Sequence, residues 1–174
     1  MKVTSTGIID GRIADEYGAK GKDFSPGGMA SRSIPFTIHD SPAGTVAYAV
    51  IFDDDDAVTA CGFTWVHWLL SDLEKTDVKA DASRTDKTLI QGITSWHSCA
   101  GDLSKQEATA YGGPAPPNFE HRYTLKVYAL DRKLGLKNGF MLNELKRAMD
   151  DHILAKAQMI GTYSPKTAHS GRGG

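Results

Sequence analysis

The chain has 174 residues, of which 40% are hydrophobic, and its 20 basic and 21 acidic side chains leave a net charge of −1. This length and apolar content suit one globular domain, and the near-neutral charge gives no overall attraction to nucleic acid or to an anionic membrane. No stretch approaches the ~20 apolar residues of a membrane-spanning helix, and residues 1–18 hold no apolar run of signal-peptide length. We therefore expect a cytoplasmic protein without a transmembrane segment.

The cysteine content gives no sign of a disulfide framework. Cys61 and Cys99 form no C-x-x-C pair, and two cysteines are too few for a disulfide scaffold, so we expect reduced thiols. The only obvious base beside either thiol is His97, two residues before Cys99, and the sequence has no G-x-S-x-G elbow. No catalytic residue is assigned.

The predicted strands follow one another through the first three quarters of the chain. The first 45 residues are rich in turn signals and include a predicted strand over residues 33–39. Residues 47–52, AYAVIF, are continuously apolar and bounded by turn residues; this favours a strand buried on both faces, although periodicity alone leaves a buried helical turn open. Two further strands are predicted over residues 66–71 and over residues 123–130, YTLKVYAL.

One long helix is predicted near the C-terminus, over residues 143–160. It begins at a cap, Asn143, ends before Gly161, and has apolar residues at helical spacing, namely Leu145, Met149, Ile153, Ala157 and Ile160. A short helix is also expected around residues 75–82. Residues 165–174 lack the apolar content that offsets ordering entropy and are expected to be a flexible tail. The sum is a mostly β, sandwich-like domain over residues 1–164.

Four consecutive aspartates, Asp53 to Asp56, follow the predicted strand over residues 47–52. If the strand continues through them, Asp54 and Asp56 share one face, and Asp53 and Asp55 share the other. A solvated acidic loop is the simplest interpretation of the run by itself. The run lacks the D-x-D-x-D-G spacing and the downstream glutamate of an EF-hand loop, so no calcium site is predicted.

A histidine and a histidine–tyrosine pair provide polar groups for a pocket. His67 lies in a predicted strand within the motif WVHW, where a lone histidine is more often structural. The Gly/Pro-rich segment 111–117, YGGPAPP, leads into a second strand, where alternation places His121 and Tyr123 on one face. A rigid loop of this kind is typical of small polar pockets. Two imidazoles, a phenol and a carboxylate together suit a small phosphate ester.

The motifs DDDDA, WVHW, YGGPAPP, HRY and VYALD, in this order and at this spacing, resemble the phosphatidylethanolamine-binding protein family, specifically its bacterial Raf-kinase-inhibitor-like branch. The resemblance extends from about Ser25 to Tyr163 and includes the DDHIL and IGTY segments. It implies a two-sheet, β-sandwich-like fold with a C-terminal helix. It also implies a homodimer, because bacterial relatives commonly pair.

The resemblance further implies a small anion pocket at the positions that match the family's motifs. Its ligand-binding residues are Asp54, His67, His121, Tyr123, Pro114 and Pro116. Supporting residues are Asp56, which accepts backbone N–H groups of the turn, Trp65, Gly113 and Arg122, whose side chain is expected to pair with an acid behind the pocket. No role follows for Asp53 and Asp55, which are expected as surface charge.

The sequence departs from the family's pattern in two places. The family's D-P-D-A-P signature falls on residues 54–58, where Asp55 and Val58 replace both prolines, and in the family this turn includes a cis peptide. Residues 93–111 occupy the place of a loop that leads to the pocket wall. A surface loop is expected there, with the alternative that Trp96 and His97 approach the site.

Three functions are weighed. The favoured one is a non-enzymatic protein without a cofactor that binds phosphate or the phosphorylated head group of a small molecule or lipid; a regulatory, kinase-inhibitor-like role stays open. The alternative is a weak hydrolase of a small phosphate or acyl ester that uses histidine and aspartate as acid and base. A 2-His-1-carboxylate metal site is the third, but the family uses the same residues for anions, so no metal is predicted.

Overall fold

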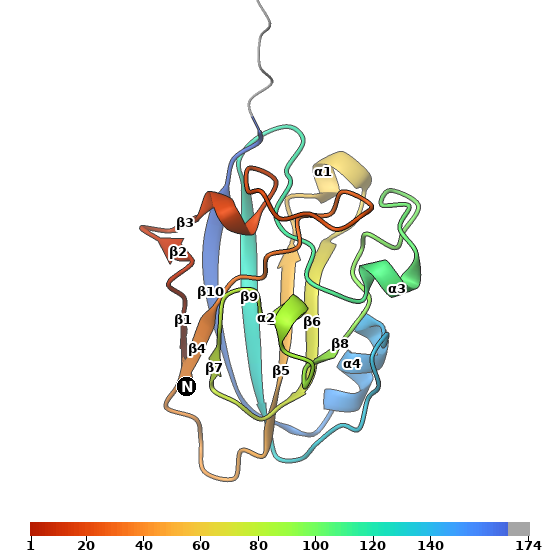
Figure 1. Cartoon of the computed structure of the whole chain (residues 1–174). Coiled ribbons are helices and arrows are strands. Elements are labelled where there is room, and N and C mark those ends of the chain that lie inside the picture. Colours follow the sequence, from red (N-terminus) through yellow and green to blue (C-terminus); the bar gives the residue numbers. More distant parts are fainter. Residues whose placement is uncertain (167–174) are drawn as a thin grey trace, which may run out of the picture.

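The computed structural model describes residues 1–166, which form two packed β-sheets (Figure 1). The strands of the larger sheet, in spatial order, are β2 (Ile8–Ile9), β3 (Arg12–Ile13), β10 (Ile153–Tyr163), β9 (His121–Leu130), β5 (Ala47–Asp54), β6 (Trp65–Leu73) and β8 (Ile90–Gln91). Those of the smaller sheet are β1 (Lys2–Thr4), β4 (Phe36–His39) and β7 (Asp77–Val78). The helices are short: η1 (Asp15–Tyr17), α1 (Val58–Cys61), α2 (Ala82–Thr85), α3 (Lys105–Ala108) and α4 (Leu142–Met149).

Strand β5 is the centre of the larger sheet and is buried along its whole length. It pairs antiparallel with β6 on one side and with β9 on the other, as a strand covered on both faces requires. At its last residue, Asp54 lies opposite Trp65 of β6 and opposite Tyr123 of β9. The sheet register therefore brings three segments that are distant in sequence to one end of the sheet.

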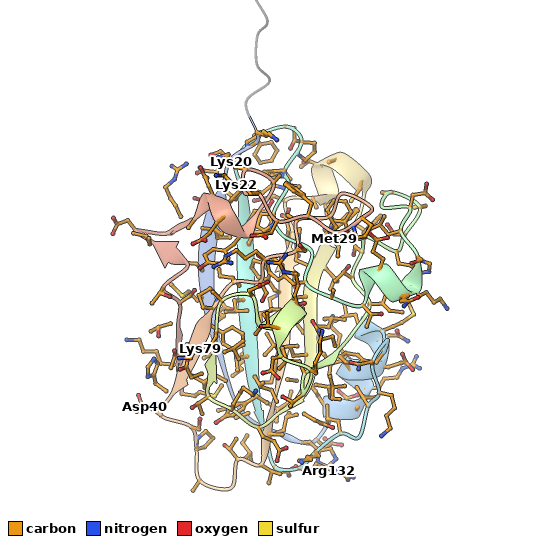
Figure 2. The ribbon with its side chains drawn as sticks, in the orientation of Figure 1. Lys20, Lys22, Met29, Asp40, Lys79 and Arg132 are labelled. Carbon is orange, nitrogen blue, oxygen red and sulfur yellow. The ribbon has the colours of Figure 1, made fainter. Side chains whose placement is uncertain are left out.

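The core has two parts, one on each face of the larger sheet. Between the sheets, Phe36 of β4 packs edge-to-face on Trp68 of β6. On the opposite face, α4 buries Leu145 and Met149 against the outer side of β5 and β6. Side chains fill the space between the layers, whereas charged groups such as Lys79, whose side chain is 81% exposed, lie outside (Figure 2).

The predicted fold class and the four predicted strands are confirmed. The observed strands are β4, β5, β6 and β9, and each differs from its prediction by a few residues at one or both ends. The short helix expected at 75–82 is wrong, because β7 occupies Asp77–Val78 and α2 begins only at Ala82. Thr76 and Lys79 flank a two-residue edge strand whose register is fixed by Phe36 of the neighbouring β4.

The C-terminal helix is present but ends much earlier than predicted. It begins at Leu142 rather than after a cap at Asn143 and stops at Met149; the Glu144 carboxylate accepts the Met141 N–H at 2.7 Å. The chain turns at Asp151, which has a positive φ of 64°. The second half of the predicted helix, 153–160, is instead the first part of β10, antiparallel to β9.

Alternation explains why residues 153–160 form a strand. Ala155, Ala157 and Met159 face the core between the sheets, while the side chains between them are more exposed. The apolar positions thus satisfy a period of two as well as a helical period, and pairing with β9 decides the outcome.

The described residues end at Lys166. Of the predicted flexible tail, 165–174, only Pro165 and Lys166 are described; residues 167–174 lie outside the described residues. Within residues 1–166, no helix is long and apolar enough to cross a membrane.

Candidate functional site

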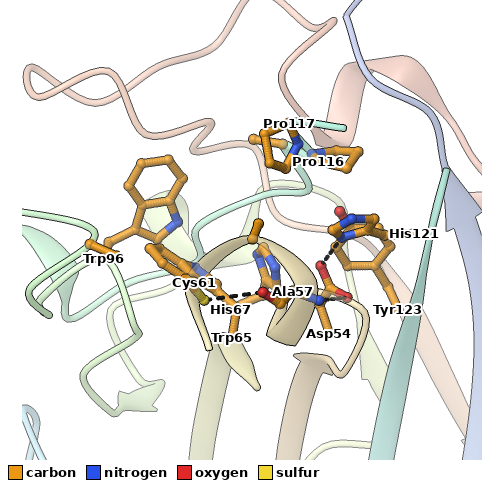
Figure 3. A pocket seen from close by; sticks show the side chains of 13 residues that line it. Asp54, Ala57, Cys61, Trp65, His67, Trp96, Pro116, Pro117, His121 and Tyr123 are labelled. Carbon is orange, nitrogen blue, oxygen red and sulfur yellow. Dashed lines mark hydrogen bonds and ion pairs between the residues drawn. The ribbon is translucent and has the colours of Figure 1, made fainter. Parts of the chain in front are cut away.

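A cavity of about 270 Å³ lies at the end of the larger sheet where β5, β6 and β9 meet. Asp54, His67, His121 and Tyr123 all line it (Figure 3). Asp54 is the last residue of β5, and His67 lies in β6. His121 and Tyr123 are the first and third residues of β9. The structure thus brings together the four residues that the sequence placed in one pocket.

Asp54 and His121 form a buried pair on the floor of the cavity. The His121 Nδ1 lies 2.7 Å from the Asp54 Oδ2, and the two side chains are only 1% and 4% exposed. The other Asp54 oxygen, Oδ1, accepts the N–H of Ala57 at 3.1 Å. Both carboxylate oxygens are therefore occupied by protein groups, which fixes the orientation of Asp54.

The second nitrogen of His121 is also occupied, by a residue that the sequence did not indicate. His121 Nε2 lies 2.7 Å from Asn118 Oδ1. The amide orientation of Asn118 is set by its neighbours, because Oδ1 accepts the Phe119 N–H and Nδ2 donates to Thr59 Oγ1. Both ring nitrogens of His121 are therefore bonded to protein oxygens, which holds the ring in place from both sides.

His67 is buried and bonds to the backbone rather than to a carboxylate. Its Nδ1–H donates to the Gly112 carbonyl at 2.5 Å. Burial of the ring lowers its pKa from 6.5 to about 4, an effect only partly offset by the Gly112 carbonyl and by Asp54. His67 is thus neutral at pH 7, and its Nε2, which has no hydrogen-bond partner within residues 1–166, is left as an acceptor.

The Tyr123 hydroxyl is buried near the Asp54 carboxylate. Tyr123 is 1% exposed, and its Oη makes no hydrogen bond of normal geometry within the described chain. Burial, reinforced by the negative charge of Asp54 and by the approach of its carboxylate to the hydroxyl, raises the pKa of the phenol far above its usual range. The group is therefore a neutral O–H at pH 7.

The walls of the cavity are apolar. Trp65 and Trp96 line one side, and Pro116 and Pro117 line another. Of the two prolines expected in the pocket, Pro116 lines the cavity. Pro114 does not, because it faces the N-terminal segment, where its carbonyl accepts the Ala19 N–H at 2.8 Å.

The backbone of the Gly/Pro-rich segment holds the rim in place. The Gly113 N–H donates to the Ala30 carbonyl at 2.8 Å, and the Gly112 N–H donates to the His67 carbonyl at the same distance. A Cβ on Gly113 would lie 2.2 Å from the Tyr17 carbonyl oxygen, so only glycine permits this approach.

Comparison with known proteins identifies the family of this chain. The family model of the phosphatidylethanolamine-binding proteins matches residues 4–164. The chain belongs to this family. The Bacillus subtilis protein YxkA is 40% identical over 154 residues, which cover 85% of this chain and 87% of its own. A protein of Methanothermobacter thermautotrophicus is 31% identical over 158 residues, or 88% and 91% of the two chains.

A solved structure extends the comparison to three dimensions. The crystal structure of a phosphatidylethanolamine-binding protein homologue from Chlamydia trachomatis superposes with a TM-score of 0.76 at 28% identity and covers 95% of this chain and 97% of its own. In the present chain, Asp55 and Val58 stand where the family's signature has prolines. The turn is closed by the Val58 N–H, which donates to the Asp55 carbonyl at 3.3 Å. No cis peptide bond occurs within residues 1–166.

Other predicted roles around the site are partly corrected. Asp56 was expected to accept backbone N–H groups of its own turn, but its Oδ2 accepts the backbone N–H of Arg122 in β9 at 2.8 Å, which ties the loop to that strand. The Arg122 side chain is exposed and makes no ion pair within residues 1–166, so the predicted pairing through its guanidinium is wrong. Asp53 is not surface charge: it is 7% exposed and pairs with Lys126 across to β9. Asp55 accepts the Thr64 hydroxyl at 2.8 Å.

The loop over residues 93–111 contributes one wall of the site. Trp96 lines the cavity, which fits the alternative considered for this segment, whereas the His97 Nδ1 bonds to the Leu103 carbonyl at 2.7 Å and stabilises the loop. No cluster of three or more potential metal-ligating side chains occurs within residues 1–166.

Proposed function

We propose that this protein binds a small phosphate monoester in the cavity lined by Asp54, His67, His121 and Tyr123. One observation carries the proposal: the buried Tyr123 hydroxyl makes no hydrogen bond of normal geometry within residues 1–166, and His67 beside it, with ring centroids 5.1 Å apart, offers an unpartnered acceptor nitrogen. Buried polar groups without partners are rare in folded proteins and call for a ligand or water. Membership of the phosphatidylethanolamine-binding protein family supports a binding role.

A monoprotonated phosphate group complements these two positions. One of its oxygens accepts the Tyr123 O–H, and its P–O–H group donates to the neutral His67 Nε2. Both oxygens of the buried Asp54 carboxylate already bond to protein groups, to His121 Nδ1 at 2.7 Å and to the Ala57 N–H at 3.1 Å. Tyr123 and His67 are therefore the groups that meet the phosphate.

The hydrolase alternative has less support from the contacts. Both His121 nitrogens are bonded to protein groups, so neither is free as a general acid or base. The Cys61 thiol lines the cavity but donates to the backbone carbonyls of Ala57 and Phe63, both at 3.3 Å. The homodimer and a kinase-inhibitor-like role stay predictions from the resemblance.

Calorimetric titration with inorganic phosphate and O-phosphorylethanolamine at pH 6 tests the proposal. We compare Tyr123→Phe, which removes only the hydroxyl in the cavity, with Tyr128→Phe, a matched control on the other face of the same strand. We expect saturable one-to-one binding that Tyr123→Phe weakens by about ten- to hundredfold, the value of a hydrogen bond to a charged group. Tyr128→Phe is expected to leave it unchanged.

Two results would count against this function. Absence of saturable binding by either phosphate compound would refute it outright, and equal losses in the two tyrosine variants would show that the hydroxyl in the cavity plays no part. Steady release of phosphate from p-nitrophenyl phosphate above the blank, abolished by His67→Gln, would instead favour the hydrolase.

A further inference from the structure

Beside the polar residues at the floor of the cavity, two indole rings, Trp65 and Trp96, form an aromatic wall. The Trp65 and Trp96 rings meet edge-to-face at 86° with centroids 5.5 Å apart. Phe63 stacks behind Trp65, with centroids 5.9 Å apart and planes inclined by 11°. In Figure 3 the two indoles lie on one side of the cavity, and the Pro116 and Pro117 rings lie across from them.

The position of Trp96 is fixed by its own loop. Its carbonyl accepts the Leu103 N–H at 2.9 Å, which closes the loop. Two glycines make room for it: a Cβ on Gly101 would lie 2.3 Å from the Trp96 carbonyl oxygen, and one on Gly112 would lie 2.4 Å from the indole ring. Backbone contacts on both sides therefore hold Trp96 where it lines the cavity, without the ordering cost of a mobile side chain.

The size of the cavity limits what these walls can receive. Its volume of about 270 Å³ lies just under the ~300–1,000 Å³ of pockets for drug-sized ligands. There is room inside for a phosphate group and one ring. Neither indole N–H has a hydrogen-bond partner within residues 1–166, so no polar contact of the protein draws the rings away from the cavity.

We propose that the cavity selects aryl phosphate monoesters over alkyl ones, with Trp65 and Trp96 as the residues that determine this specificity. The phosphate lies against His67 and Tyr123, and the aryl ring lies between the indole wall and the two prolines. Aromatic rings prefer the offset and edge-to-face contacts that two perpendicular indoles offer, whereas an alkyl chain gains only from burial. This specificity rests on the function proposed above.

The test compares phenyl phosphate with propyl phosphate and inorganic phosphate by calorimetry on the whole chain. We expect phenyl phosphate to bind about three- to tenfold more tightly than propyl phosphate, the range that aromatic pairs contribute. Trp96→Leu keeps an apolar side chain and is expected to bring phenyl phosphate to the affinity of propyl phosphate. The Trp68 indole N–H, which is buried in the core, is expected to keep its NMR signal in this variant, which shows that the fold is intact.

The unmodified protein provides a second readout through its three tryptophans. The Trp68 indole N–H is buried in the core and donates to Gln91 Oε1 at 2.9 Å, so it serves as an internal control. Phenyl phosphate, through its ring current, is expected to shift the indole N–H signals of Trp65 and Trp96 but not that of Trp68. Propyl phosphate is expected to shift them much less.

The outcomes separate this inference from the function on which it rests. Equal affinities for phenyl and propyl phosphate would overturn the aryl preference while leaving the phosphate site in place. Tighter binding of O-phosphorylethanolamine than of phenyl phosphate would also overturn it, because the indoles would then hold an ammonium group by cation–π contact. If none of the phosphate compounds binds, both proposals fail.

Discussion

Burial of the neutral His67 ring makes the stability of the protein depend on pH. In the folded chain, burial lowers the His67 pKa from 6.5 to about 4. The unfolded chain therefore binds a proton at this residue below about pH 6.5, while the folded chain does not until about pH 4. It follows that the His67 contribution is fully present above pH 6.5 and is lost as the pH falls towards 4.

The size of the effect follows from the two pKa values. One pKa unit corresponds to about 1.4 kcal/mol, so the complete loss amounts to about 3 kcal/mol. Between pH 7 and pH 5 the expected loss is about 2 kcal/mol, because the unfolded-state imidazole is almost fully protonated at pH 5 and the folded-state one is not.

Urea unfolding at pH 7 and pH 5 measures this difference. Other groups titrate over the same interval, so the wild-type change is compared with that of His67→Gln, which keeps a polar side chain but does not titrate. His39→Gln, at an exposed position of β4, is the control. We expect the wild type and His39→Gln to lose about 2 kcal/mol more than His67→Gln between the two pH values. Equal losses in all three proteins would refute the buried, neutral state of His67.

Two further predictions concern the structure around the cavity. Asp54→Asn and His121→Gln are each expected to lower the free energy of unfolding by about 1–3 kcal/mol, since each leaves one member of a buried pair without its hydrogen-bond partner. In a double-mutant cycle by urea unfolding, a coupling energy near zero would contradict the pair. Gly112→Ala is expected to cost about 1–3 kcal/mol through overpacking against Trp96, and a thermal midpoint equal to that of the wild type would contradict this packing.

The central strands of the sheet were predictable because burial on both faces leaves a plain signal. The continuous apolar run 47–52 has no polar alternation, and the structure buries it on both sides in β5. Alternation along β9 places His121 and Tyr123 on one face, whereas Asp54 and His67 were assigned to the same pocket through the resemblance to the family.

Secondary structure and burial were predicted wrongly where the local sequence is compatible with two conformations and long-range pairing determines which one forms. Residues 153–160 satisfy a helical and a strand period, and the ladder with β9 selects the strand. The charge of Asp53 suggested the surface, but Lys126 reaches it from the neighbouring strand, 73 positions away in the chain. Long-range pairing of this kind leaves no local trace.

Asn118 was missed for a similar reason. It lies in the loop between the prolines and β9, where an asparagine is ordinary turn chemistry. Only the folded chain shows that its amide oxygen bonds to His121 Nε2 at 2.7 Å. Together with the Asp54 contact, it leaves neither ring nitrogen of His121 free for the ligand.

The most direct test of the phosphate site is an NMR titration of the histidine ring signals with inorganic phosphate at pH 6. A phosphate group that donates to the neutral His67 Nε2 changes the surroundings of the imidazole ring directly. We expect the His67 ring signals to move saturably, with the same midpoint as the calorimetric titration, while those of the exposed His39 stay in place. A His67 signal that does not respond at saturating phosphate would contradict the account.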